Sequence, residues 1–326
     1  MHVPEKTHII VTMTEKLYQI IRTVRPRQWL KNFSLFAAPL FFGNLFDEKV
    51  FSQALTAFLV FCLVSSATYI MNDLIDAPKD RLHPVKKNRP IASGKLSEKL
   101  AWIVAFVLML SSLYFGMFSV GTFFTVALMI YIILQLTYSL YLRNVIILDS
   151  LAVGSGFVLR VFAGGFATNT SLSSWLILAT IGLSLLLAFG KRRSERTLLK
   201  KHMKLIEEGS TRQTLRHYPD TLLDSMISMS SSLCIITYSL FAFQISPDTT
   251  TDRLKDILPS ILSSPRWMML TIPFVIYGVA RYLYVIYEKE EGESPERVLL
   301  SDFPLLASIV LWGLSILGII YLYPTL

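Results

Sequence analysis

The sequence predicts an all-α, polytopic membrane protein with nine transmembrane helices. Hydrophobic residues make up 53% of its 326 residues, and the mean hydropathy is +0.52. Charged residues make up only 17% of the chain, against about 25% in an ordinary soluble domain. This composition excludes a disordered chain and argues against a soluble globular enzyme.

Nine stretches are long and apolar enough to cross a membrane, because a spanning helix needs about 20 mostly apolar residues. The first stretch is the weakest, since it is short and carries Lys31 and Asn32. The third and fourth stretches meet at Val120-Gly121, almost without a loop. The expected spans cover residues 29–46, 51–73, 100–120, 121–141, 145–166, 173–190, 223–245, 267–287 and 303–323.

Basic residues set the expected orientation of these spans. With the N-terminus in the cytoplasm, the cytoplasmic segments contain 26 of the 31 Lys and Arg residues, and the outer loops contain 4. Cytoplasmic loops of membrane proteins carry such an excess. We therefore expect a multi-pass protein of the cell (inner) membrane, with a cytoplasmic N-terminal tail (1–24) and a single membrane-embedded domain (25–326). Two long charged loops, 77–99 and 191–222, then both face the cytoplasm.

An acidic motif occurs where the second span ends. Asn72, Asp76 and Asp80 recur at four-residue intervals. Asp73 lies three residues before Asp76, so a helix presents the four side chains on one face. Pro78 should end or distort that helix, in which case Asp80 lies in the following loop. Carboxylates this close repel unless a cation lies among them, and oxygen ligands without His or Cys favour Mg²⁺. The alternative is a set of solvated carboxylates at a helix end.

Two basic segments accompany the acidic motif. The loop that follows it contains Lys86, Lys87 and Arg89, and the sixth span ends in Lys191 and Arg192. A metal site beside fixed cations suits a diphosphate, because the metal neutralises some oxygens and basic side chains bind the rest. The alternative for each group is the ordinary positive charge of cytoplasmic loops.

The acidic motif resembles that of the UbiA superfamily of membrane prenyltransferases, which hold a prenyl diphosphate through Mg²⁺ with two acidic motifs. The second of those motifs follows the sixth span. At that place this chain has a basic run, Lys191 to Arg193, and a single carboxylate at Glu195. A site for two metals and a prenyl diphosphate is therefore half missing. The resemblance also implies that the nine helices surround a central cavity.

A particular branch of the superfamily departs in this same way, the decaprenyl-phosphate phosphoribosyltransferases, and the resemblance to it covers nearly the whole chain. The similar segments are Arg25–Asn32, His83-Pro84 with Arg89–Gly94, Ser155–Arg160 with Gly164-Gly165, Gly190–Arg192 and Glu291–Glu296. The resemblance implies a catalytic domain that transfers 5-phosphoribose from phosphoribosyl diphosphate (PRPP) to a polyprenyl phosphate of the decaprenyl type and releases diphosphate. The acceptor phosphate is already an anion, so no general base is required.

Motif and resemblance together predict the site residues. The expected Mg²⁺ ligands are Asn72, Asp73, Asp76 and Asp80. The residues expected to bind PRPP are Lys31, Tyr69, Lys86, Lys87, Arg89, Tyr138, Arg143, Lys191 and Arg192. For the two tyrosines, packing near the membrane interface is an equal alternative. Arg160 is the only basic residue well inside a span, and it either anchors the acceptor phosphate or makes structural contacts.

Two other functions stay open from the sequence. A UbiA-type prenyltransferase would use a prenyl diphosphate and an aromatic acceptor, and the missing second acidic motif argues against it. A transporter of an anionic metabolite would be expected to have Gly- or Pro-broken helices in matched halves and would not need a Mg²⁺ cluster. We expect the membrane, PRPP and a polyprenyl phosphate as partners, and no nucleic acid. The sequence leaves open the polyprenyl chain length and whether the chain forms a homo-oligomer.

Overall fold

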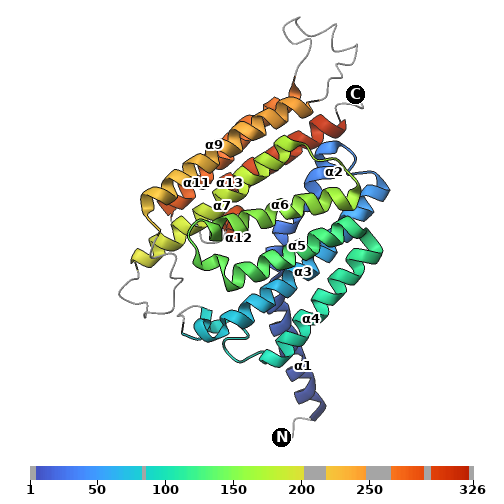
Figure 1. Cartoon of the computed structure of the whole chain (residues 1–326), viewed down its shortest axis with the longest axis vertical. Coiled ribbons are helices and arrows are strands. Elements are labelled where there is room, and N and C mark those ends of the chain that lie inside the picture. The colour runs from blue at the N-terminus through green and yellow to red at the C-terminus, as the bar shows by residue number, and fades with distance from the viewer. Residues whose placement is uncertain (1–4, 83–85, 202–217, 247–265, 290–294, 323–326) are drawn as a thin grey trace, which may run out of the picture.

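The computed structural model describes residues 5–82, 86–201, 218–246, 266–289 and 295–322, which are mostly helical (Figure 1). The α-helices are α1 (Glu5–Val24), α2 (Ala37–Phe42), α3 (Glu48–Asp80), α4 (Glu98–Phe115), α5 (Thr122–Leu140), α6 (Leu148–Thr168), α7 (Ser174–Lys201), α9 (Asp220–Ile245), α11 (Ile272–Tyr284), α12 (Pro295–Ser301) and α13 (Phe303–Leu317). Shorter 3₁₀ or π segments are η1 (Pro26–Phe36), η2 (Lys86–Asn88), η3 (Gly116–Val120), η4 (Leu142–Asn144), η6 (Trp267–Thr271), η7 (Val285–Lys289) and η8 (Gly318–Leu322). The described residues form no β-strand, so the predicted all-α class is confirmed.

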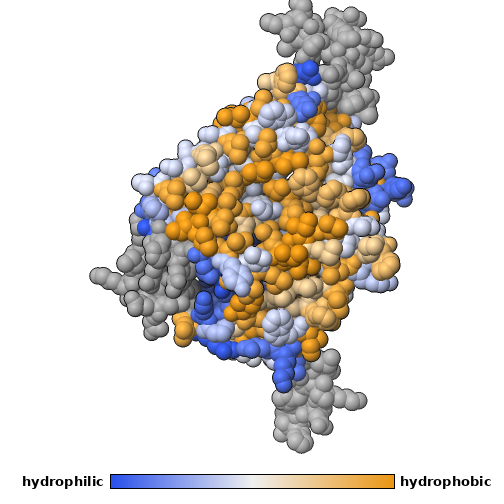
Figure 2. Space-filling view, viewed as in Figure 1, coloured by the Kyte–Doolittle hydropathy of each residue, from blue (hydrophilic) through white to orange (hydrophobic). Residues whose placement is uncertain are grey.

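Eight helical segments in the described part of the chain are long and apolar enough to cross a membrane. They correspond to the second through ninth predicted spans. Hydrophobic residues cover the broad middle of the visible face, whereas hydrophilic residues gather toward its rims (Figure 2). Helix α1 extends from one end of the bundle, and α13 ends toward the other (Figure 1). This distribution is that of a multi-pass helical membrane protein.

The first predicted span, residues 29–46, is wrong as a continuous α-helix. An 11-residue 3₁₀ segment, η1, precedes the six-residue helix α2. Polar side chains of η1 bond to α3: Asn32 Nδ2 donates to Ser65 Oγ (3.2 Å), and Trp29 Nε1 donates to Ser66 Oγ (3.0 Å). These tertiary hydrogen bonds override the local helical preference, and the sequence alone does not reveal them.

Helix α3 does not end at Pro78 as expected. It continues to Asp80, and the carbonyl of Ala77 accepts a backbone hydrogen bond from the N–H of Arg81 (3.1 Å). A proline removes one helical donor, but here only the last turn follows it. Asp80 therefore keeps its helical position on the face that carries the other acidic residues.

Capping side chains begin three of the spanning helices. The Asp47 carboxylate accepts from the N–H groups at the start of α3, Ser97 does the same for α4, and Asp302 for α13. Asp302 also pairs with Arg281 (2.9 Å) and Lys289 (2.8 Å), which ties α13 to α11 and η7. The hydrogen bonds from Arg281, together with Lys289, hold the pKa of Asp302 well below its usual range.

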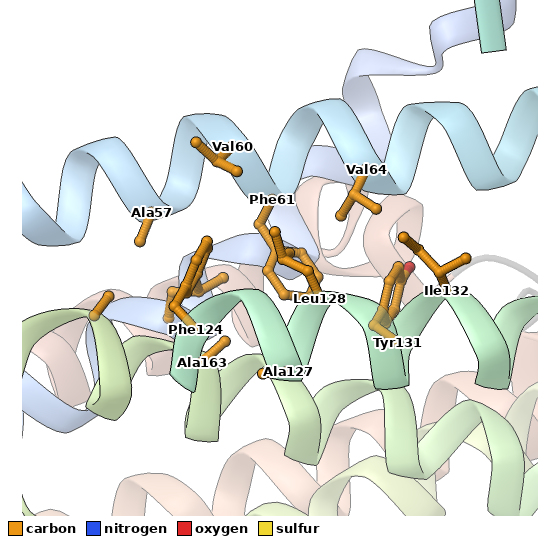
Figure 3. Close-up of a cluster of buried hydrophobic side chains, with 12 residues drawn as sticks. Ala57, Val60, Phe61, Val64, Phe124, Ala127, Leu128, Tyr131, Ile132 and Ala163 are labelled. Atoms are coloured by element: carbon orange, nitrogen blue, oxygen red, sulfur yellow. The ribbon is translucent and has the colours of Figure 1, made fainter. Parts of the chain in front are cut away.

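A hydrophobic cluster joins α3, α5 and α6 (Figure 3). Phe61 of α3 meets Phe124 and Tyr131 of α5, with ring centroids 6.5 Å and 4.9 Å away. Small residues, including Ala127 and Ala163, let the three helices approach closely, as is usual where helices pack in a membrane.

Two glycines permit still closer contacts. A Cβ on Gly164 of α6 would lie 1.9 Å from the carbonyl oxygen of Leu35 in η1. A Cβ on Gly182 of α7 would lie 2.6 Å from the backbone nitrogen of Cys234 in α9. In both places backbone meets backbone, so no side-chain rotation can relieve a clash.

Replacing Gly164 with Ala is expected to lower the free energy of unfolding by about 3 kcal/mol, the upper end of the usual cost of overpacking. Gly313→Ala is the matched control, because nothing lies within 4 Å of its added Cβ. The control should leave stability unchanged or raise it by about 0.5–1 kcal/mol. Thermal unfolding of the detergent-purified variants measures both, and equal melting temperatures would contradict the close packing of η1 on α6.

Candidate active site

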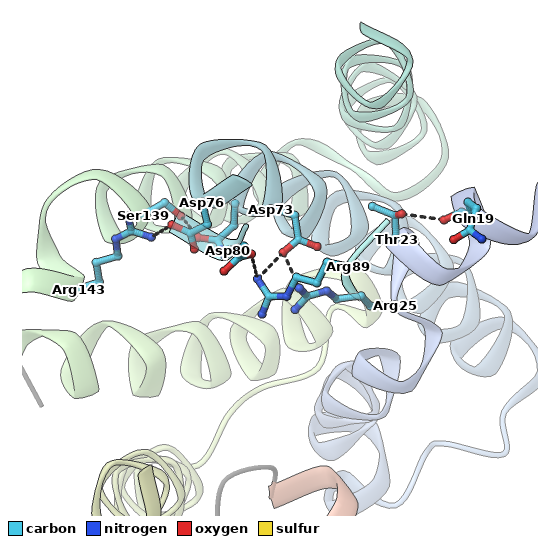
Figure 4. A network of polar contacts seen from close by, with 10 residues as sticks. Gln19, Thr23, Arg25, Asp73, Asp76, Asp80, Arg89, Ser139 and Arg143 are labelled. Carbon is cyan, nitrogen blue, oxygen red and sulfur yellow. Dashed lines mark hydrogen bonds and ion pairs between the residues drawn. The ribbon is translucent and has the colours of Figure 1, made fainter. Parts of the chain in front are cut away.

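The predicted acidic residues gather at the end of α3, and arginines from three other segments reach them (Figure 4). Asp73 Oδ1 accepts from Arg25 Nη2 (2.5 Å) and from Arg89 Nη1 (3.0 Å). The same Arg89 nitrogen donates to Asp80 Oδ2 (2.6 Å). Asp73 and Asp80 are buried, with 3% and 4% of their surface exposed, so their charges need such partners.

The other two predicted ligands face the segment between α5 and α6. Asp76 Oδ1 accepts a hydrogen bond from the guanidinium of Arg143 in η4. Asn72 Oδ1 accepts from Ser139 Oγ near the end of α5 (3.0 Å). Arg143, expected to bind PRPP, is thus held against the acidic face.

The acidic face fits a divalent cation in its donor chemistry. Over the described residues, no group of three or more His, Cys, Asp or Glu side chains gathers closely enough to hold a metal. Two carboxylates nevertheless converge on one positive point, because Arg89 Nη1 lies between Asp73 and Asp80. Mg²⁺ commonly uses one or two carboxylates and completes its shell with water and substrate phosphates. Asp73 and Asp80 are therefore the residues here best placed to hold it.

A second charged cluster lies at the end of α7. The guanidinium of Arg192 is only 2% exposed. Its Nε donates to Asp149 Oδ2 (2.6 Å), its Nη1 to Glu195 Oε2 (2.7 Å) and its Nη2 to the Tyr138 hydroxyl (3.1 Å). Lys191 is more accessible, with 37% of its side chain exposed, and its Nζ lies 3.9 Å from Glu195 Oε1. The structure thus brings the predicted residues Tyr138, Lys191 and Arg192 together.

Two members of this cluster are absent from the predicted site, Asp149 and Tyr218. The Tyr218 hydroxyl donates to Asp149 Oδ1 (2.5 Å) and accepts from the backbone N–H of Ile147 (2.7 Å). Burial, with a further contribution from Asp149, raises the pKa of Tyr218 to about 12. Ile147 has φ +71°, which is strained for a β-branched residue. In the sequence, the sign of this cluster was Asp149, a single aspartate within the apolar fifth predicted span.

Arg160 makes structural contacts deep in the bundle. It donates to Asn32 Oδ1 (2.8 Å), to the carbonyl of Gly156 (2.6 Å) and to the Tyr131 hydroxyl (2.9 Å). Its guanidinium also lies over the Phe61 ring, 5.3 Å from the centroid. These partners account for a buried cation at this depth.

An apolar cavity of about 500 Å³ lies between η1, α2, α6, α7, α9, α11, α12 and α13. Lys31 is the single charged residue on its wall in the described part of the chain. Its Nζ lies 3.7 Å from Glu296 Oε2, and Gln28 Nε2 donates to Glu296 Oε1 (2.5 Å). Burial acts to raise the pKa of Glu296. The charge of Lys31 and the hydrogen bond from Gln28 act in the opposite direction, and the pKa is held below its usual value.

The remaining predicted residues lie around the acidic face. The Arg25 guanidinium sits over the Tyr69 ring, 5.7 Å from its centroid. Lys86 is partly buried in η2 and acts electrostatically on Asp80, whereas Lys87 beside it is exposed. Arg25 appeared in the sequence only as part of a similar segment, and its contact with Asp73 depends on the fold.

Fold and site together define a polytopic membrane protein whose helices enclose an apolar cavity beside clustered carboxylates and cations. The UbiA prenyltransferase family matches residues 33–193. The decaprenyl-phosphate phosphoribosyltransferase of Mycolicibacterium smegmatis is 34% identical over 307 residues, which cover 93% of this chain and 92% of that protein. The protein of the same name from Corynebacterium glutamicum is 32% identical over 94% of this chain and 87% of its own length. The chain belongs to the UbiA prenyltransferase family.

The fold is also that of a solved structure, a UbiA homolog from Archaeoglobus fulgidus bound to GPP and Mg²⁺. The TM-score is 0.66 at 17% sequence identity, and the match covers 93% of this chain and 99% of the other. At this identity the likeness establishes the common fold, and the site must be argued from this chain's own residues.

Arg192→Gln is expected to lower the free energy of unfolding by about 3–5 kcal/mol, because it leaves the buried Asp149 without its cation. The neighbouring Arg193→Gln is the matched control. Arg193 pairs with Asp224, whose side chain is 42% exposed, and such pairs contribute about 0–1 kcal/mol. Thermal unfolding of both variants compares them, and equal losses would contradict a special role for the buried pair.

Proposed function

We propose that this protein transfers the 5-phosphoribosyl group of PRPP to a polyprenyl phosphate of the decaprenyl type, with Mg²⁺ as its cofactor. The observation that carries the proposal is a pair of charged groups that meet the end of α5: carboxylates of α3, where Asn72 bonds to Ser139, and cations of α7, where Arg192 bonds to Tyr138. PRPP has two anionic ends, a diphosphate on C1 and a phosphate on C5. The names of the relatives from Mycolicibacterium smegmatis and Corynebacterium glutamicum support the same reaction.

The diphosphate end belongs at the acidic face. Asp73 and Asp80 would hold Mg²⁺, which supplies charge neutralisation of the leaving diphosphate. Arg89 already pairs with Asp80, and Arg143 pairs with Asp76. Both guanidiniums can turn to phosphate oxygens, with Asn72, Lys86 and Lys87 close by. Arginine binds such oxygens in pairs.

The C5 phosphate belongs at Lys191, with Arg192 behind it. Lys191 is the accessible cation of the α7 cluster, and Tyr138 and Arg192 are already joined by a hydrogen bond. Glu296 lies within electrostatic reach of both Lys191 and Lys31. The sugar would then lie between the α3 and α7 clusters, above the cavity.

We place the polyprenyl chain of the acceptor in the cavity. Its apolar wall suits a polyprenyl chain, and Lys31 gives the acceptor phosphate a cation at the charged end. A phosphate oxygen of the acceptor forms the new bond to C1, while the C1–O bond to the diphosphate breaks and diphosphate leaves with the electron pair. No proton has to be removed from the acceptor, so catalysis rests on orientation and on neutralising the leaving group.

We place the charged end of the bundle at the cytoplasmic face of the cell (inner) membrane, because 26 basic residues fall on that side of the predicted topology. PRPP is soluble and highly charged, so it can reach the site only from water. The lipid acceptor reaches it from the bilayer.

The test is incubation of the detergent-purified chain with labelled PRPP, Mg²⁺ and a panel of polyprenyl phosphates, followed by mass spectrometry of the lipid fraction. A phosphoribosylated lipid, lost on chelation of Mg²⁺, is the expected product. Prenyl diphosphates with aromatic acceptors form the second panel. Product from that panel, and none from PRPP, would replace the proposal with prenyl transfer.

Asp76→Asn is expected to reduce transfer at least 100-fold without unfolding the protein, because it removes a charge from the acidic face at constant volume and frees Arg143. The loss corresponds to about 2.7 kcal/mol of transition-state stabilisation. Glu98→Gln removes an exposed carboxylate that pairs with Arg81 and should keep normal activity. Near-normal turnover of Asp76→Asn at saturating Mg²⁺ would contradict this assignment.

Lys191→Ala is expected to raise the dissociation constant for PRPP by about one to two decades, since a charge-assisted phosphate contact contributes about 1.5–3 kcal/mol. Affinity for a short polyprenyl phosphate should change much less. Calorimetric titration of both ligands measures the difference, with Lys49→Ala as a control that removes an exposed lysine at the start of α3. Equal weakening of both ligands would show that Lys191 is not specific to the donor.

A further inference from the structure

Two buried polar atoms beside the cavity lack a hydrogen-bond partner within the described residues: Glu296 Oε2 and the hydroxyl oxygen of Tyr282. Tyr282 is 4% exposed. The other carboxylate oxygen of Glu296 is bonded to Gln28, whereas Oε2 has an ion pair with Lys31 at 3.7 Å but no hydrogen bond. Proteins satisfy nearly all buried polar atoms, and each exception calls for an explanation.

Tyr282 borders the cavity itself, and Glu296 lies beside Lys31, a charged residue of the cavity wall. Glu296 Oε2 lies 3.7 Å from Lys31 Nζ, beyond hydrogen-bond distance. Pro295, the residue before Glu296, borders the same cavity as Tyr282. A Cβ on Gly190 of α7 would lie 3.1 Å from the Tyr282 hydroxyl. That Cβ would also lie 2.6 Å from Ile286 Cδ1, so the glycine lets Tyr282 and η7 pack directly against α7, one residue before Lys191.

The chemistry of the two atoms selects the kind of group that fits them. Glu296 is held in its ionised form, so its free oxygen accepts hydrogen bonds and repels anions. A phosphate has only acceptor oxygens and would be repelled there. A sugar hydroxyl can donate to the carboxylate and accept from the tyrosine at the same time.

We infer that Glu296 and Tyr282 bind a ring hydroxyl of the sugar that is transferred, and so select ribose over its deoxy analogues. This inference rests on the proposed transfer from PRPP. It also agrees with the geometry of that proposal, in which the sugar lies between the α3 and α7 clusters, since Glu296 lies within electrostatic reach of Lys191 and of Lys31.

The test combines analogues of the sugar with variants of the protein. The purified full-length chain is assayed with PRPP and with its 2-deoxy and 3-deoxy analogues, and kcat/KM is compared. A hydrogen bond to a charged group implies that the wild type prefers PRPP over one analogue by about 10- to 100-fold. Glu296→Ala should abolish most of that preference, and Glu296→Gln should restore part of it. Tyr282→Phe, which removes only an unpartnered hydroxyl, should reduce the preference with no loss of thermal stability.

Two controls carry the same chemical changes elsewhere. Glu98→Gln alters an exposed carboxylate, and Tyr277→Phe alters an exposed tyrosine one turn and a half before Tyr282 on the same helix. Both should keep the wild-type preference. An unchanged preference in Tyr282→Phe and in both Glu296 variants, with normal transfer from PRPP, would overturn this inference and leave the proposed reaction intact. Absence of any transfer by the wild type would overturn both.

Discussion

The pairing of buried charges holds the charged end of this bundle together. Arg192 and Asp149 have 2% and 0% of their side chains exposed, and removing such ions from water costs several kcal/mol each unless they are paired. The partners come from distant parts of the chain. Arg25 precedes η1, Arg89 follows η2 and Arg143 lies in η4, yet all three reach carboxylates of α3. The pairs therefore hold connecting segments against α3, in addition to apolar contacts such as those of Ile91 and Leu96.

The same pairing suits the proposed chemistry. A diphosphate and Mg²⁺ bring nearly matched charges into the site. On binding, Asp73 and Asp80 would exchange their arginine partners for Mg²⁺, while the Arg89 guanidinium would bind phosphate oxygens. In the proposed exchange each of these charges would gain a new partner, which would offset the cost of an isolated buried ion. Arg192 differs, because it is buried against Asp149, whereas Lys191 beside it is more accessible and is the cation that we propose for substrate binding.

Hydropathy was sufficient to predict eight spans, because a run of about 20 apolar residues is a local property. The acidic face of α3 was also predictable, since it depends only on helical spacing. The first span was not, because Asn32 and Trp29 are held by α3, and such contacts leave no local pattern. Asp149 and Tyr218 were missed for the same reason: they lie 69 residues apart. Asp149 is at the start of α6 and Tyr218 precedes α9, so the packing of α6 and of α9 on α7 brings them together. The resemblance to a known branch supplied the reaction, which spacing alone could not.

The irregular first segment connects the structural core to the cavity. Successive residues of η1 have opposite roles: Asn32 is fully buried and accepts from Arg160 (2.8 Å), whereas Lys31 lies on the cavity wall. Arg160 in turn bonds to Tyr131 within the cluster that joins α3, α5 and α6. The hydrogen bonds of Asn32 thus hold η1 in place and set the position of Lys31. Gly164 allows this segment to lie directly against α6, so the charge at the end of the cavity depends on backbone packing in the core.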